Sequence, residues 1–73
     1  MELRLKVDNS FVNKLNKKLG KTTATALTQD ALTLLNWAVE EISKNRVILS
    51  SDENGNDIKR LEMPVFHKVK KDE

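Results

Sequence analysis

The chain of 73 residues contains no cysteine and only one histidine, and these absences limit how it can be stabilised. Without cysteine it can form neither a disulfide nor a thiolate metal site, and His67 alone cannot make a metal cluster. A domain this small buries only about 60% of its unfolded surface, and it usually recruits a disulfide, a metal or a second subunit. The sequence therefore predicts a second subunit, and neither a metal nor a cofactor.

Long apolar runs and catalytic motifs are also missing. No apolar run approaches the roughly 20 residues that span a bilayer, and nothing resembles a signal peptide, so we expect a cytoplasmic protein without a membrane partner. There is no glycine-rich phosphate loop, no paired-carboxylate site on a rigid element and no histidine-based constellation. The sequence predicts that the protein is not an enzyme and that His67 is a surface residue.

Positive charge is concentrated in the first third of the chain, although the net charge is only +2. Residues 1–22 carry six basic and two acidic side chains, a net of +4, whereas residues 23–46 and 47–73 each carry a net of −1. A concentrated basic segment is typical of a protein with a polyanionic partner, and it is equally compatible with a solvated basic face. Lys14, Lys17 and Lys18 are expected to belong to such a solvated face.

Residues 1–7 alternate between apolar and charged side chains, as in a half-buried strand. The apolar face carries Leu3, Leu5 and Val7, and the charged face carries Glu2, Arg4 and Lys6. A lone strand leaves its backbone hydrogen-bonding groups unpaired, and even a hairpin is marginal in water. Because helices follow, we expect the strand to pair with its copy in a second molecule, and a two-stranded ribbon of this kind fits the major groove of DNA.

Two helices are predicted after the strand. The first is about ten residues long, begins after the N-cap candidates in residues 8–10, and ends at Gly20. The second runs from Ala24 to about Asn45, a stretch without glycine or proline, and either of the two preceding threonines can cap it. Its apolar stripe is wider than the roughly 100° that a surface helix needs, which favours a subunit interface. The stripe contains Leu27, Ala31, Leu34, Leu35, Ala38 and Ile42, and Leu32 and Val39 widen it. Trp37 lies further around the helix and is expected in the core or the dimer interface.

The chain changes character after Arg46. Residues 47–49 are strand-like, and Asn54-Gly55 is typical of a hairpin turn. The acidic residues around this glycine do not form a calcium loop, because the glycine comes too early for the EF-hand spacing. Residues 67–73 are expected to form a solvated, frayed tail after Pro64 ends the hairpin.

The register of this hairpin is decided by like charges. A two-residue turn would place Asp52 opposite Asp57, which is unfavourable because like charges repel across a strand pair. The sequence therefore favours a three-residue turn, which pairs Leu49 with Leu61 and Val47 with Met63.

Strand, short helix, glycine-containing turn and long helix follow one another in an order that resembles the ribbon-helix-helix DNA-binding family, represented by the Arc, MetJ and CopG repressors. Two stretches carry the likeness: the alternating Glu2–Val7, and Gly20-Lys21-Thr22-Thr23-Ala24-Thr25-Ala26-Leu27. The resemblance covers residues 2 to about 45. It implies a mainly α fold in which two chains pair one short amino-terminal strand each, antiparallel, and interlock their helices into a homodimer. Residues 1–45 would form this DNA-binding and dimerisation domain, and residues 46–73 a carboxyl-terminal extension.

The resemblance also implies site residues. The outward side chains of the ribbon, which would contact base edges in the major groove, are Glu2, Arg4 and Lys6. The start of the second helix, which would grip a DNA phosphate, comprises Lys21, Thr22, Thr23 and Ala24. A helix amino terminus favours an anion on its own account, because it presents free N–H donors and partial positive charge. The chain departs from the family pattern in its acidic Glu2 and in its extension.

Three functions remain open at this point. The first is a homodimeric transcriptional regulator that represses by occupying a promoter on double-stranded DNA. The second is an antitoxin-type or other protein-interaction module whose residues 46–66 bind a partner protein, and the third is a structural dimer that binds no DNA. Many ribbon-helix-helix antitoxins bind DNA with the amino-terminal half, so the second function is compatible with DNA binding. The alternative to a DNA contact is that Arg4 and Lys6 are ordinary solvent-facing residues of a half-buried strand.

Overall fold

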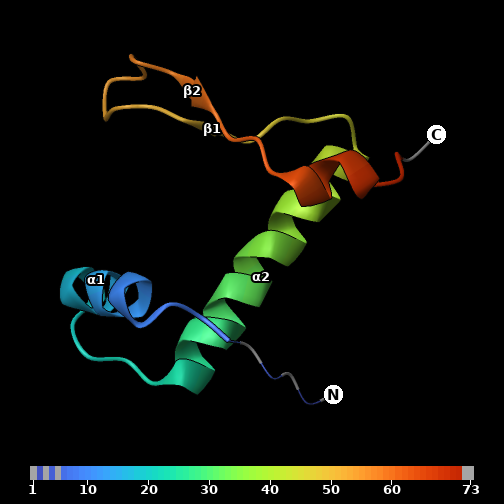
Figure 1. The fold of residues 1–73 in the computed structure, drawn as a ribbon. Coiled ribbons are helices and arrows are strands. Elements are labelled where there is room, and N and C mark those ends of the chain that lie inside the picture. Colours follow the sequence, from blue (N-terminus) through green and yellow to red (C-terminus); the bar gives the residue numbers. More distant parts are fainter. Residues whose placement is uncertain (1, 3, 5, 72–73) are drawn as a thin grey trace.

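The computed structural model describes residues 2, 4 and 6–71, and it is mainly helical with one small antiparallel sheet (Figure 1). Its elements in chain order are α1 (Asn9–Leu19), α2 (Ala24–Ser43), β1 (Leu49–Ser50), β2 (Lys59–Arg60) and the 3-10 helix η1 (Pro64–Lys68). Figure 1 shows a loop that joins α1 to the amino-terminal end of α2, and the sheet and η1 toward the carboxyl-terminal end of that helix. The long helix therefore separates the two halves of the molecule.

Both ends of α1 are set by the residues that the sequence indicated. Asp8 is the N-cap, and its carboxylate accepts hydrogen bonds from the Ser10 backbone N–H at 3.1 Å and from the Ser10 hydroxyl at 2.9 Å. Gly20 follows the helix with a φ of 75°, in the left-handed region where a side chain would be strained. The predicted boundaries of this helix are therefore confirmed.

Helix α2 ends two residues earlier than predicted, in a Schellman motif. Asn45 has a φ of 64°, which asparagine tolerates better than most residues. Its N–H donates to the Ile42 carbonyl at 2.9 Å, and the Arg46 N–H donates to the Glu41 carbonyl at 3.1 Å. These bonds satisfy carbonyls that the helix end would otherwise leave free. They also turn the chain, so that the residues after Arg46 leave the helix axis.

The predicted register of the hairpin is wrong by one residue. Leu49 lies opposite Arg60 and Ser50 opposite Lys59, and the Leu61 N–H donates to the Ile48 carbonyl at 2.8 Å. The pairings of Leu49 with Leu61 and of Val47 with Met63 are therefore not formed. The strands instead follow the register of the two-residue turn that the sequence disfavoured.

The loop between the strands explains this error. Asp52 and Asp57 do not face each other within the ladder, because pairing stops at Ser50 and Lys59. The Asp52 carboxylate accepts hydrogen bonds from the backbone N–H groups of Asn54 at 3.0 Å and Asn56 at 2.7 Å, as in an Asx-type turn. The repulsion that guided the prediction is thus relieved by the loop, and it does not fix the register.

The core lies at the carboxyl-terminal end of α2. Ala38 and Ile42 of α2 and Phe66 of η1 are its buried residues, and half-buried apolar side chains pack around them, namely Leu35, Ile48, Val65 and Val69. Pro64 opens η1, where its fixed φ and missing N–H are tolerated. Burial of Phe66 ties the extension back onto the helix.

Residues 67–71 differ from the solvated tail that the sequence predicted. Val69 packs against the core, and the Lys71 ammonium group donates to the Ile42 carbonyl at 3.0 Å. The Ile42 carbonyl already accepts from the Asn45 N–H, so the lysine is a further donor to it, and its charge lies at the partially negative end of the helix. The chain is therefore fixed onto α2 as far as Lys71, and residues 72–73 lie outside the described part.

Candidate nucleic-acid interface

The charged side chains of the predicted ribbon precede α1. Glu2, Arg4 and Lys6 are all exposed, and within the described residues no hydrogen bond or ion pair involves them. Residues 2, 4, 6 and 7 are not paired with either strand of the carboxyl-terminal sheet. Leu3 and Leu5, which the prediction places on the apolar face, lie outside the described residues, so the ribbon stays a prediction.

The amino terminus of α2 presents free backbone donors. Thr23 is its N-cap: the hydroxyl oxygen accepts from the Ala26 N–H at 3.0 Å, and the carbonyl accepts from the Leu27 N–H at 3.0 Å. In the described part of the chain the N–H groups of Ala24 and Thr25 have no acceptor, as expected in a first helical turn. Sequence reasoning left the cap open between Thr22 and Thr23, and it did not include Thr25 among the donors. Lys21 is exposed next to this turn.

The cap can be tested directly. Thr23→Ala removes the hydroxyl that accepts from Ala26, and we expect it to lower the free energy of unfolding by about 1 kcal/mol. Thr22→Ala is the matched control, because its side chain takes part in no hydrogen bond among the described residues, and it is expected to change stability by less than about 0.5 kcal/mol. Urea denaturation of both variants at one protein concentration measures the difference. Equal losses in the two variants would show that the hydroxyl of Thr23 does not act as a cap.

The cations of the amino-terminal half are not neutralised within the described chain. All of its ion pairs lie between residues 41 and 67, and the shortest joins Arg60 Nε to Glu62 Oε1 at 2.7 Å. The exposed cations that precede α2 are Arg4, Lys6, Lys14, Lys17, Lys18 and Lys21. No hydrogen bond or ion pair of the described residues brings the ribbon cations onto the start of α2. These cations, taken together, give the amino-terminal half a positive charge, and such a charge attracts polyanions.

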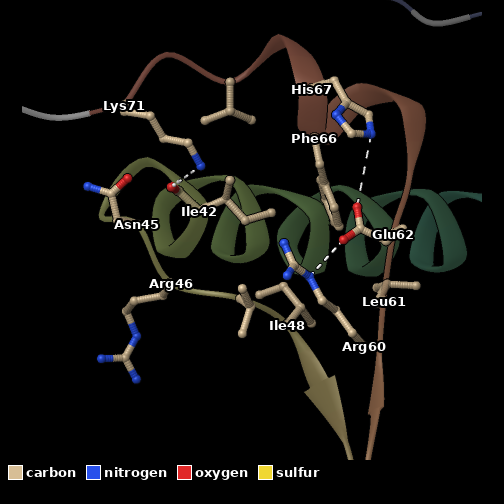
Figure 2. A pocket seen from close by; sticks show the side chains of 12 residues that line it. Ile42, Asn45, Arg46, Ile48, Arg60, Leu61, Glu62, Phe66, His67 and Lys71 are labelled. Atoms are coloured by element: carbon tan, nitrogen blue, oxygen red, sulfur yellow. Dashed lines mark hydrogen bonds and ion pairs between the residues drawn. The ribbon is translucent and has the colours of Figure 1, made fainter.

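The carboxyl-terminal half contains a groove that sequence reasoning missed. Its cavity has a volume of about 350 Å³ and lies where the end of α2, the hairpin and η1 meet (Figure 2). Ile42, Ile48 and Phe66 are among its apolar lining residues, and the cations Arg46, Arg60 and Lys71 also line it. These segments are far apart in the sequence, and the net charge of −1 for residues 47–73 concealed the gathering of cations.

The described residues form neither a metal site nor a membrane-spanning helix, and no similar protein was found. In residues 2, 4 and 6–71 no three acidic or histidine side chains come together so as to hold a metal ion. No helix of this part of the chain combines the length and the apolar character needed to cross a membrane. Comparisons with models of known families, with curated proteins and with solved structures found no match.

Proposed function

We propose that the chain is a sequence-specific, double-stranded DNA-binding transcriptional repressor of the ribbon-helix-helix type. Two copies pair residues 2–7 as an antiparallel ribbon, interlock their helices and insert the ribbon into the major groove. Binding to a promoter then excludes the transcription machinery by occupancy. The single observation that carries this proposal is the unburied apolar surface of the amino-terminal half.

That surface is unusually large for so small a chain. None of the residues of α1 is buried, and in α2 only Ala38 and Ile42 are, at the end that contacts η1. Phe11 is 61% exposed and Leu34 is 65% exposed, and further large apolar side chains of these helices are exposed as well, namely Leu15, Leu19, Leu32 and Trp37. Contiguous exposed apolar surface marks an interaction site, and each such side chain contributes about 1.5–3 kcal/mol when fully buried. A second copy of the same two helices supplies a matching surface.

The charges of the amino-terminal half support DNA as the partner. With the apolar face of the ribbon turned to the helices, Arg4 and Lys6 face outward, where an arginine can donate two hydrogen bonds to one guanine. Glu2 can accept from the amino group of a cytosine. The free N–H groups of Ala24 and Thr25 can donate to a phosphate oxygen, with Lys21 adding charge beside it. The proposed phosphate contact thus comprises the residues that the family resemblance implies, namely Lys21, Thr22, Thr23 and Ala24, with Thr25 added as a donor.

Selection of bound duplexes from a random pool tests the proposal. We expect enrichment of a sequence with two half-sites related by two-fold symmetry, because the two chains of the dimer present the same residues to each. The binding constant should fall steeply with salt, with a log–log slope of about −0.9 for each phosphate neutralised. Sedimentation of the free protein at micromolar concentration should show a dimer. A monomeric folded species, or a pool without enrichment, would contradict the proposal.

One observation favours a second function. The extension also exposes apolar side chains, among them Val47, Leu49, Ile58 and Leu61, which a partner protein could cover. The alternative is therefore an antitoxin-type or other protein-interaction module whose residues 46–66 bind that partner. A dimer that shows no salt-dependent binding to any duplex would instead be a structural interaction module.

A further inference from the structure

The hairpin of the extension is incomplete as an isolated sheet. Each strand has two residues, and among residues 2, 4 and 6–71 each has one edge without a neighbouring strand. Leu49 in β1 is 53% exposed, and Ile58, just before β2, is 61% exposed. A two-stranded hairpin is marginally stable in water, and an uncovered apolar edge tends to pair with another chain. The hairpin is therefore expected to have a partner.

Charge is separated along the extension. Residues 51–58, the tip of the hairpin, carry three acidic side chains and no basic one: Asp52, Glu53 and Asp57. Residues 59–71 carry five basic side chains and one acidic, a net of +4. Arg60 and Lys71 from this segment line the groove together with Arg46 (Figure 2). The groove has an apolar floor and a rim that contains these three cations and one carboxylate, that of Glu62, which pairs with Arg60 at 2.7 Å. Its net positive charge still complements an acidic segment that carries an apolar side chain.

The chain itself contains such a segment, in a place where it cannot reach its own groove. Ile58 lies beside Asp57 at the tip. Figure 1 shows the hairpin running away from η1 and from the end of α2, so that the tip is the part of the extension farthest from the groove. The complementary groove must therefore belong to another molecule.

We propose that the extension is a second self-association surface, in which the acidic hairpin tip of one copy docks into the basic groove of another. Ile58 covers the apolar floor near Ile42 and Phe66, and the Glu53 carboxylate lies against the cations of the rim, whereas Asp52 binds its own loop and Asp57 pairs with Lys59. A two-fold axis between the copies repeats the contact, so each copy gives one tip and receives one, and this pair of contacts is closed. The paired hairpins together supply the additional strands that a stable sheet needs.

This contact is distinct from the amino-terminal dimer and does not require DNA. The hairpin and α1 lie at opposite ends of α2, so the contact joins one dimer to another (Figure 1). Two loops bury less than the 1,200–2,000 Å² typical of a stable interface, so the free protein should associate weakly through them. Proteins already held close together, such as neighbours on one DNA molecule, would associate through them more readily.

Exchange of charge between tip and groove tests the proposal. Glu53→Lys reverses a tip charge, and Arg46→Glu reverses a rim charge; each is expected to weaken self-association by roughly tenfold. Arg46 pairs with Glu41 at 3.0 Å, but its side chain is 68% exposed, so loss of the pair should affect folding little. An equimolar mixture of the two variants should recover association, because in a mixed pair both contacts join opposite charges. The chain with both substitutions should recover it too. Sedimentation velocity of the full chain over a concentration series, without DNA, is the measurement.

Matched controls separate this contact from the amino-terminal one. Asp30→Lys makes the same charge change on an exposed position of α2 and should leave association through the hairpin unchanged. Ile58→Ser should abolish only the larger assembly, whereas Leu34→Ser should weaken the dimer. If the single reversals sediment like the wild type, or if their mixture behaves like each variant alone, the proposal is wrong. A surface that serves a partner protein of another sequence would give the first result, since the purified chain alone contains no such partner. The DNA-binding proposal would survive either result.

Discussion

Joint replacement of Arg4 and Lys6 with alanine is expected to abolish sequence-specific DNA binding while leaving the circular dichroism spectrum unchanged. Both side chains are exposed, and neither takes part in an interaction among the described residues, so the fold should tolerate their loss. An arginine that binds guanine with two hydrogen bonds contributes about 1–3 kcal/mol of discrimination, and the dimer presents it twice. The affinity for the selected site should therefore fall on the order of 10²- to 10⁴-fold. Fluorescence anisotropy with the selected duplex and with a scrambled one measures this loss.

A matched variant separates base reading from general charge. Lys17→Ala with Lys18→Ala removes the same charge from exposed positions of α1. If the ribbon reads the bases, this control should weaken binding to both duplexes to a similar extent and keep the preference between them. Retention of that preference by the Arg4 and Lys6 double variant would show that the ribbon is not the reading element.

Phe66→Ala is expected to cause the largest loss of stability. Phe66 is 7% exposed and is the only buried side chain that the described extension contributes to the core. Replacing a buried phenylalanine with alanine costs about 3–5 kcal/mol, a large part of the 5–15 kcal/mol that stabilises a typical domain. The extension should then detach from α2, while the helices remain. Hydrogen exchange should show lost protection of the Val69 N–H, which donates to the Phe66 carbonyl, and of the Leu61 N–H, which donates to the Ile48 carbonyl.

The neighbouring residue provides the control. The side chain of His67 is 78% exposed and lies 4.0 Å from Glu62 without contributing to the core. His67→Ala is therefore expected to change the free energy of unfolding by less than about 0.5 kcal/mol. Unchanged protection of Val69 and Leu61 in the Phe66 variant would mean that the extension is held by contacts other than this ring.

The helix boundaries were predictable because local interactions set them. Asp8, Gly20 and Thr23 act within a few residues of their own positions, so their side-chain chemistry is visible in the sequence. The hairpin register was not predictable from cross-strand charge, because the Asp52 carboxylate turns inward to bind backbone N–H groups of its own loop. The packing of Val69 and Lys71 was missed for a related reason: seven mostly charged residues show no periodicity from which a docked segment could be inferred.

The candidate site also has parts that local sequence determines and parts that depend on distant residues. The cap and free donors at the start of α2 follow from the threonines themselves, and the single chain is enough to form them. The proposed ribbon would need a second chain before its hydrogen bonds could form, so its geometry would depend on residues of another molecule. The groove depends on the left-handed turn at Asn45, which brings Arg46 near Arg60 and Lys71, residues separated from it by a long stretch of chain.

The two ends of α2 make different contacts, and this separation has an evolutionary consequence. Ala38 and Ile42 anchor the extension, whereas Leu27, Ala31 and Leu34 lie toward the other end of the helix and touch none of that core. Substitutions near the amino-terminal end of α2 and substitutions in the core with Phe66 therefore act on different contacts. If the proposed function holds, this separation would let one DNA-reading unit acquire new partners by recombination at a single helical junction.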